Sequence, residues 1–145
     1  MVPARILVVD DTSDVLTLVC RVLEGQGYDV LTASDGEAAM AACEQAQGAI
    51  DLLLTDIMMP GISGIELAGS LVAAYPKVRV LFISGQCERS EIPALVSDRG
   101  FGFVPKPFLP HVLLDAVQKM LAPAKRPPQS DDSALLIRPA RRLPG

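Results

Sequence analysis

Five polar residues stand at or just beyond the ends of short apolar runs in this chain, where their side chains could carry chemistry. Asp10 and Asp11 follow the first run, Asp56 follows the third, Ser84 closes the fourth and Lys106 follows the fifth. A carboxylate can act as a nucleophile and form an aspartyl phosphate, while a metal ion, a lysine and a hydroxyl stabilise charge on the transferring oxygens. If the runs are strands that end at one edge of a sheet, these residues predict a phosphoryl-transfer site.

The carboxylates of Asp10, Asp11 and Asp56 require a compensating cation if they lie together. Like charges about 4 Å apart repel by roughly 1 kcal/mol in water and by about 4 kcal/mol at an intermediate dielectric. No His or Cys stands near these residues, so the candidate ligand atoms are all oxygens. Mg²⁺ prefers such ligands, typically takes one or two carboxylates and bridges to a phosphate. We therefore expect Mg²⁺ as the cofactor.

Strands and helices are predicted to alternate through most of the chain. Short runs rich in branched residues predict buried strands, and apolar residues at i, i+3, i+4 and i+7 predict amphipathic helices. The predicted strands cover residues 6–9, 28–33, 50–55, 78–83 and 101–104. The predicted helices cover residues 15–23, 36–47, 65–72, 89–96 and 109–121. Five such units imply a parallel α/β sheet with helices on both faces, in which ligands bind beyond the carboxyl ends of the strands.

Composition and charge change after residue 122. Residues 1–122 carry 8 Lys and Arg against 15 Asp and Glu, whereas residues 123–145 carry 5 against 2 and are rich in Pro and Arg. Half of the chain is hydrophobic, which is enough for one core. We expect one domain over 1–122 and a disordered tail over 123–145. The acidic body, and a tail too short for a DNA-binding domain, argue against direct contact with nucleic acid.

The sequence lacks the patterns of a secreted, zinc-binding or membrane protein. Its cysteines, Cys20, Cys43 and Cys87, are odd in number and include no CxxC pair. The N-terminus reaches Asp10 after a short apolar run, which has neither the layout of a signal peptide nor the length of a membrane span. We expect a soluble, cytoplasmic protein that makes no membrane contact.

Four stretches of the chain resemble the response-regulator receiver domains of two-component signalling systems. They are VVDD at 8–11, LLLTDIMMPGISGIEL at 52–67, FISG at 82–85 and FVPKPF at 103–108, and the resemblance as a whole spans 4–122. It implies a flavodoxin-like (βα)5 fold, a doubly wound parallel sheet with strand order 2-1-3-4-5. That order follows from the resemblance, because the alternation of elements by itself does not specify it.

The resemblance also implies a role for each residue at the strand ends. Asp56 would accept the phosphoryl group from a sensor histidine kinase or a histidine phosphotransfer protein. Asp11, Asp56 and the backbone carbonyl of Met58 would ligate Mg²⁺ directly, while Asp10 would act through water. Lys106 would pair with the phosphoryl group. The domain would then be no enzyme in the usual sense, since it catalyses only its own phosphorylation and dephosphorylation.

A switch to the output surface is implied as well. The hydroxyl of Ser84 would turn inward to a phosphate oxygen, and Phe103 would follow from an outward to an inward rotamer. The surface of the fourth helix, fifth strand and fifth helix would then bind a downstream protein partner or form a homodimer. The family usually has a cis peptide at the Lys106–Pro107 step, which we predict here. Leu109 departs from the family, which often has a capping residue at this position.

Other interpretations remain open for these residues and for the chain. Asp10 and Asp11 could cap the following helix, Asp56 could serve a turn, and Phe103 could be plain core. The chain could be a degenerate receiver that acts as a protein-binding scaffold. An Asp-nucleophile phosphatase would share the carboxylate, Mg²⁺ and Lys, but its DxDx(T/V) pattern does not fit. A flavodoxin-like nucleotide binder would need a phosphate-cradling loop after the first strand, which this sequence lacks.

Overall fold

Five parallel strands form a single sheet in this computed structural model, which describes residues 3–85 and 100–122. The strands are β1 (Arg5–Val9), β2 (Asp29–Ala33), β3 (Leu52–Asp56), β4 (Arg79–Ser84) and β5 (Gly102–Pro105). The helices of the described residues are α1 (Ser13–Glu24), α2 (Gly36–Gln45), α3 (Gly64–Ala74) and α5 (Pro110–Leu121). The strands lie in the order β2-β1-β3-β4-β5, which confirms the flavodoxin-like fold expected from the resemblance.

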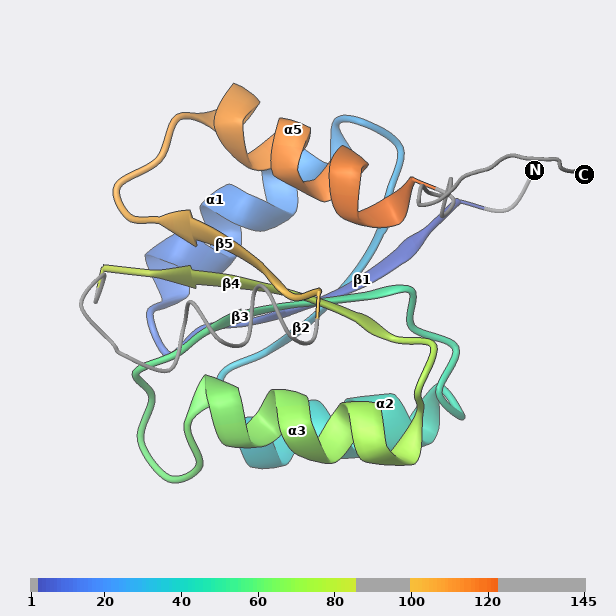
Figure 1. Ribbon diagram of the computed structural model, residues 1–145. Coiled ribbons are helices and arrows are strands. Elements are labelled where there is room, and N and C mark those ends of the chain that lie inside the picture. The colour runs from blue at the N-terminus through green and yellow to red at the C-terminus, as the bar shows by residue number, and fades with distance from the viewer. Residues whose placement is uncertain (1–2, 86–99, 123–145) are drawn as a thin grey trace, which may run out of the picture.

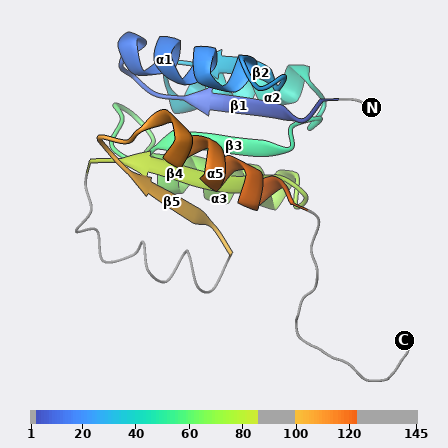
Figure 2. The ribbon, with the colours of Figure 1, turned by 90° about the horizontal axis from the view of Figure 1, so that it is seen from above.

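The helices cover both faces of the sheet. Figures 1 and 2 show α1 and α5 on one face, and Figure 1 shows α2 and α3 on the other. Along β1, Ile6 and Val8 pack among residues of α1 and α5, whereas Leu7 and Val9 pack among residues of α2 and α3. Because both faces of the strands are covered, the strands read as continuous apolar runs in the sequence. None of the helices within the described residues is both long and apolar enough to cross a bilayer.

The predicted elements are confirmed wherever the structure describes the chain, with ends displaced by a few residues. Asp56 is the last residue of β3, whereas the apolar run predicts it directly after the strand. β4 and β5 each begin and end one residue later than predicted. Displacements of one or two residues are usual at the ends of elements. The helix predicted over 89–96, the tail over 123–145 and Cys87 lie outside the described residues.

Two helix starts matter for the site. α3 begins with a capping box, in which Ser63 Oγ accepts the N–H of Glu66 at 3.2 Å and the carboxylate of Glu66 accepts the N–H of Ser63 at 3.0 Å. α5 begins at Pro110, and its N-cap residue Leu109 makes no side-chain capping bond. The start of α3 is therefore fixed by two hydrogen bonds. The start of α5 has no side-chain cap, because its N-cap residue is a leucine.

Candidate functional site

The carboxyl ends of four strands bring the residues expected to carry chemistry to one edge of the sheet. Asp10 and Asp11 follow β1, Asp56 ends β3, Ser84 ends β4, and Lys106 follows β5. Since β1, β3, β4 and β5 lie side by side in that order, residues up to 96 positions apart in sequence become neighbours. This edge of the sheet therefore assembles the set of side chains that the sequence predicts.

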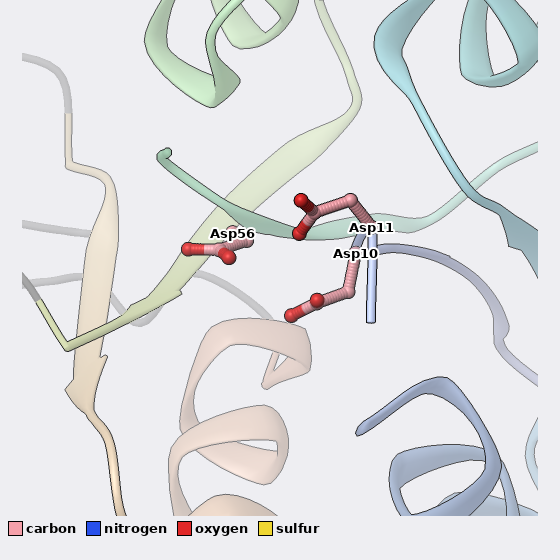
Figure 3. A group of neighbouring side chains, drawn as sticks. All are labelled: Asp10, Asp11 and Asp56. Carbon is pink, nitrogen blue, oxygen red and sulfur yellow. The ribbon is translucent and has the colours of Figure 1, made fainter. Parts of the chain in front are cut away.

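Three carboxylates gather at this edge (Figure 3). One oxygen from each of Asp10, Asp11 and Asp56 lies within 4.8 Å of the others. Asp10 is fully buried, Asp56 is 7% exposed and Asp11 is exposed. The group thus has two buried members and one that is open to solvent.

Lys106 bridges the two buried carboxylates. Its Nζ donates hydrogen bonds to Asp10 Oδ2 at 2.9 Å and to Asp56 Oδ2 at 3.2 Å. Burial by itself would lower the pKa of Lys106, but the hydrogen bond to Asp10 and the charges of Asp56 and Asp10 outweigh it. The pKa of Lys106 therefore lies above its ordinary value, and the side chain is a fixed cation at neutral pH.

Asp56 is held through both oxygens of its carboxylate. Oδ1 accepts the N–H of Ile57 at 2.7 Å, and Oδ2 accepts the bond from Lys106. Burial is the largest influence on the pKa of Asp56 and raises it. The charge of Lys106 opposes burial and the charge of Asp10 reinforces it, so the pKa of Asp56 lies above its usual range. A cation bound beside this carboxylate would favour its ionised form.

These residues fit a hard divalent cation. Three carboxylates and one ammonium leave two negative charges, which a single divalent cation balances. The candidate side-chain ligand atoms are all oxygens, as Mg²⁺ prefers. Met58 lies two residues beyond Asp56 and is half-exposed, and the metal-binding role of its carbonyl stays a prediction.

Ser84 lies on β4, beside the acceptor strand β3, and Phe103 lies on β5, the next strand along in the sheet. Ser84 is buried at the end of β4, and its backbone carbonyl accepts the N–H of Lys106 at 2.9 Å. Phe103 is half-buried, pairs with Phe82 across β4 and β5, and packs against the core on the face of α2 and α3. The peptide between Lys106 and Pro107 is cis, as predicted. The switch roles of Ser84 and Phe103 stay predictions.

Capping of the following helix by Asp10 or Asp11 is not what the structure shows. Thr12 is the N-cap residue of α1, and no side chain makes a capping bond there. Asp10 Oδ1 instead accepts the N–H of Thr12 at 2.9 Å, in the turn that leads from β1 into α1. Asp10 thus uses one oxygen for this turn and the other for Lys106.

Two residues that the sequence analysis did not single out contact the backbone of Asp56. Thr55 Oγ1 donates a hydrogen bond to the carbonyl of Asp56 at 2.8 Å. Gly64, the first residue of α3, packs so closely that a Cβ there would overlap the same carbonyl oxygen. Both residues lie inside the stretch that resembles receiver domains, but their types and spacing give no sign of this contact.

Comparisons with known proteins agree with this architecture. The family model described as the response regulator receiver domain matches residues 6–118. The sensor kinase CckA of Brucella abortus (strain 2308) is 34% identical over 118 residues, which cover 81% of this chain and 12% of CckA. The response regulator receiver protein CpdR of the same strain is 32% identical over 120 residues, which cover 83% of this chain and 98% of CpdR. This chain therefore spans a small part of one relative and nearly all of another.

A solved structure extends the comparison to three dimensions. The response regulator TrrA of Thermotoga maritima, crystallised in complex with Mg²⁺ and BeF, is similar with a TM-score of 0.70 and 34% identity. The similarity covers 81% of this chain and 99% of that one. With the family model, the relatives and the fold in agreement, the chain belongs to the response regulator receiver domains of two-component signalling.

Proposed function

We propose that this receiver is a cytoplasmic switch in which Asp56 accepts a phosphoryl group from a sensor histidine kinase or a histidine phosphotransfer protein. The observation that carries the proposal is the position of Lys106, which contacts Asp10 and Asp56 beside the three clustered carboxylates. A fixed cation next to the acceptor oxygen stabilises negative charge on a phosphoryl group during transfer. The same site offers a nucleophile and oxygen ligands for a metal.

In the proposed transfer, one carboxylate oxygen of Asp56 forms a bond to phosphorus while the P–N bond of the donor phosphohistidine breaks. The electron pair of that bond returns to the donor imidazole. Lys106 Nζ then leaves the carboxylate of Asp56 and donates to the phosphoryl oxygens instead. Its hydrogen bond to Asp10 keeps the ammonium in place. Ser84, at the end of β4, donates its hydroxyl to another phosphoryl oxygen. These charge-assisted hydrogen bonds stabilise the phosphorylated state.

Mg²⁺ is the proposed cofactor of this step. Asp11, Asp56 and the backbone carbonyl of Met58 would ligate it directly, and Asp10 would act through water. When bound, it supplies positive charge that neutralises the carboxylates and the transferring oxygens. The two negative charges left by three carboxylates and Lys106 support this assignment.

The proposed output is a contact with another protein. Ser84 and Phe103 would couple the phosphoryl group to the surface formed by the helix expected over 89–96, β5 and α5. That surface would bind a downstream partner or a second phosphorylated copy. The acidic balance of residues 1–122 supports a protein partner over nucleic acid. The domain would act only on itself, through its own phosphorylation and dephosphorylation.

Intact-mass spectrometry tests the proposal. The wild type, Asp56→Asn and Asp14→Asn are incubated with acetyl phosphate, with and without Mg²⁺. Asp14 is an exposed carboxylate in the first turn of α1 and serves as the matched control. We expect one phosphoryl group on the wild type and on Asp14→Asn, only with Mg²⁺, and none on Asp56→Asn. A folded, Mg²⁺-binding wild type that takes no phosphate would contradict the proposal. It would favour the alternative of a degenerate receiver that acts as a protein-binding scaffold.

A further inference from the structure

We infer that Gly64 and Thr55 are positioning residues of the phosphorylation site, which hold the backbone of Asp56 from two sides. This inference rests on the proposed function and deepens it, because it names residues that determine where the acceptor carboxylate lies. Neither residue is expected to touch the phosphoryl group or the metal. Their effect would pass through the peptide that follows Asp56.

Gly64 is required by space rather than by backbone conformation. It is not among the glycines with positive φ, so an alanine at this position would not strain the backbone. An added Cβ would overlap the carbonyl oxygen of Asp56, and it would lie 2.9 Å from the carbonyl carbon of Asp56 and 3.0 Å from Ile57 Cα. All three are backbone atoms, so no side-chain rotation can make room for the methyl group.

The first turn of α3 is also bonded to the acceptor segment. Gly64 N–H donates to the carbonyl of Ile57 at 2.9 Å, and Ile57 N–H donates to Asp56 Oδ1 at 2.7 Å. A short chain of bonds therefore runs from the start of α3 to the carboxylate. The capping box of Ser63 and Glu66 fixes that start in turn.

Thr55 holds the same peptide from within the sheet. Its side chain is fully buried, and its Oγ1 donates to the carbonyl of Asp56 at 2.8 Å. The carbonyl oxygen of Asp56 therefore accepts a bond from Thr55 while it lies against Gly64. A displacement of this oxygen would turn the peptide between Asp56 and Ile57 and with it the N–H that binds Asp56 Oδ1.

The site tolerates little displacement of the acceptor. Asp56 Oδ2 lies 3.2 Å from Lys106 Nζ, and one oxygen from each of the three clustered carboxylates lies within 4.8 Å of the others. A shift of about 1 Å in a reacting group can slow a reaction roughly 100-fold. A methyl group at position 64 is therefore expected to act on phosphorylation without contacting any reactant.

The experiment compares Gly64→Ala with Gly69→Ala, since both glycines lie in α3. A Cβ at Gly69 would meet no atom within 4 Å, so this variant is the matched control. We expect Gly64→Ala to slow phosphorylation by acetyl phosphate roughly 100-fold and to weaken Mg²⁺ binding measured by calorimetry. Gly69→Ala is expected to match the wild type in both. Rates are measured at a temperature at which circular dichroism shows every variant folded.

Thr55 supplies a second, independent pair of variants. Thr55→Val keeps the shape of the side chain and removes the hydroxyl, whereas Thr55→Ser keeps the hydroxyl. We expect Thr55→Val to slow phosphorylation about tenfold, the effect of one lost hydrogen bond, and Thr55→Ser to recover the wild-type rate. If Gly64→Ala fails to fold, this pair decides the inference, and equal rates for Val and Ser would overturn it.

The amide proton of Ile57 provides a readout that does not depend on phosphoryl transfer. In the wild type its NMR shift reports the bond to Asp56 Oδ1, and we expect that shift to change in Gly64→Ala and in Thr55→Val but not in Gly69→Ala. A wild type that takes no phosphate would contradict the proposed function. The amide shifts would still test whether Gly64 and Thr55 position the backbone of Asp56. If both Gly64→Ala and Thr55→Val show wild-type amide shifts and wild-type rates, the inference is overturned and the proposed function is unaffected.

Discussion

Lys106 donates a 2.9 Å hydrogen bond to the fully buried carboxylate of Asp10, which stands 96 residues earlier in the sequence. A buried carboxylate without a partner is costly, so Asp10 needs this ammonium for the stability of the fold. The same ammonium is the group proposed to stabilise the phosphoryl oxygens. Asp10 therefore fixes in advance the position of the cation that the chemistry requires.

Replacement of Lys106 by methionine is expected to destabilise the metal-free protein. The variant leaves Asp10 and Asp56 buried with no cation beside them, and breaking a buried ion pair from one side costs roughly 3 kcal/mol or somewhat more. We expect a loss near the lower of these values, about 3 kcal/mol, because the Lys106 side chain is 23% exposed and solvent weakens the ion pair. Urea unfolding in EDTA measures the loss, and addition of Mg²⁺ is expected to recover part of it.

The control for Lys106→Met is Lys119→Met. Lys119 pairs with Asp115 one turn earlier on α5, where both side chains are exposed. Exposed pairs of this kind contribute only about 0.3 to 0.5 kcal/mol. Equal losses for the two variants would show that the bridge between Lys106 and the buried carboxylates adds nothing to stability.

Asp56→Asn is expected to stabilise the metal-free protein near neutral pH. Burial raises the pKa of Asp56, so the ionised carboxylate disfavours the folded state. For a raised folded pKa, the stabilising contribution of the wild-type group is complete below its unfolded pKa of about 3.9 and is lost as pH rises through the folded pKa. The advantage of Asp56→Asn in urea unfolding should therefore grow as pH rises from about 4 toward neutrality.

Mg²⁺ should reverse that order of stability. The ion is expected to bind the wild type more tightly than Asp56→Asn, because one ligand charge is missing in the variant, and tighter binding stabilises by mass action. Unfolding midpoints are compared in EDTA and in saturating Mg²⁺ at the same pH. A variant that is less stable than the wild type in EDTA near neutral pH would contradict the destabilising effect assigned to the ionised carboxylate.

Ser84→Ala should separate phosphorylation from switching. Ser84 is buried at the end of β4, and its hydroxyl is proposed to bind a phosphoryl oxygen. Without it, Asp56 should still gain a phosphoryl group in intact-mass spectra, but the NMR shifts of β5 and α5 should respond less to phosphorylation. Ser84→Thr, which keeps the hydroxyl, is the control, and a full response in Ser84→Ala would remove Ser84 from the switch.

Leu109→Ser should stabilise the domain without affecting the chemistry. Leu109 is the N-cap residue of α5, has extended backbone angles, makes no side-chain capping bond and is 61% exposed. A serine there can bond a free N–H of the first turn, which is worth about 1 kcal/mol. Thermal unfolding measures the gain. Leu109→Ala removes the same apolar surface without supplying a cap, and an equal gain in that variant would exclude capping as the cause.

The sequence was a good guide to the elements and to the residues at their ends. The apolar runs predicted all five strands, and Ser84 and Lys106 stand where those runs placed them. The ends were less accurate: the run that predicts a strand over 50–55 corresponds to Leu52–Asp56, because apolar character alone does not show where ladder pairing begins. The resemblance supplied the strand order, which the alternation of elements leaves open.

The sequence by itself determined the alternation of strands and helices. It also determined that acids and a lysine stand at strand ends. Both follow from the spacing of apolar and turn-forming residues within short segments, which depends only on residues that are near one another in the chain. Only the tertiary structure decided that Lys106 reaches Asp10 as well as Asp56 and that Gly64 lies against the carbonyl of Asp56. These contacts join residues that are distant in sequence or that meet through backbone atoms. Such contacts exist only after strand order, register and the start of α3 place them within ångströms of one another.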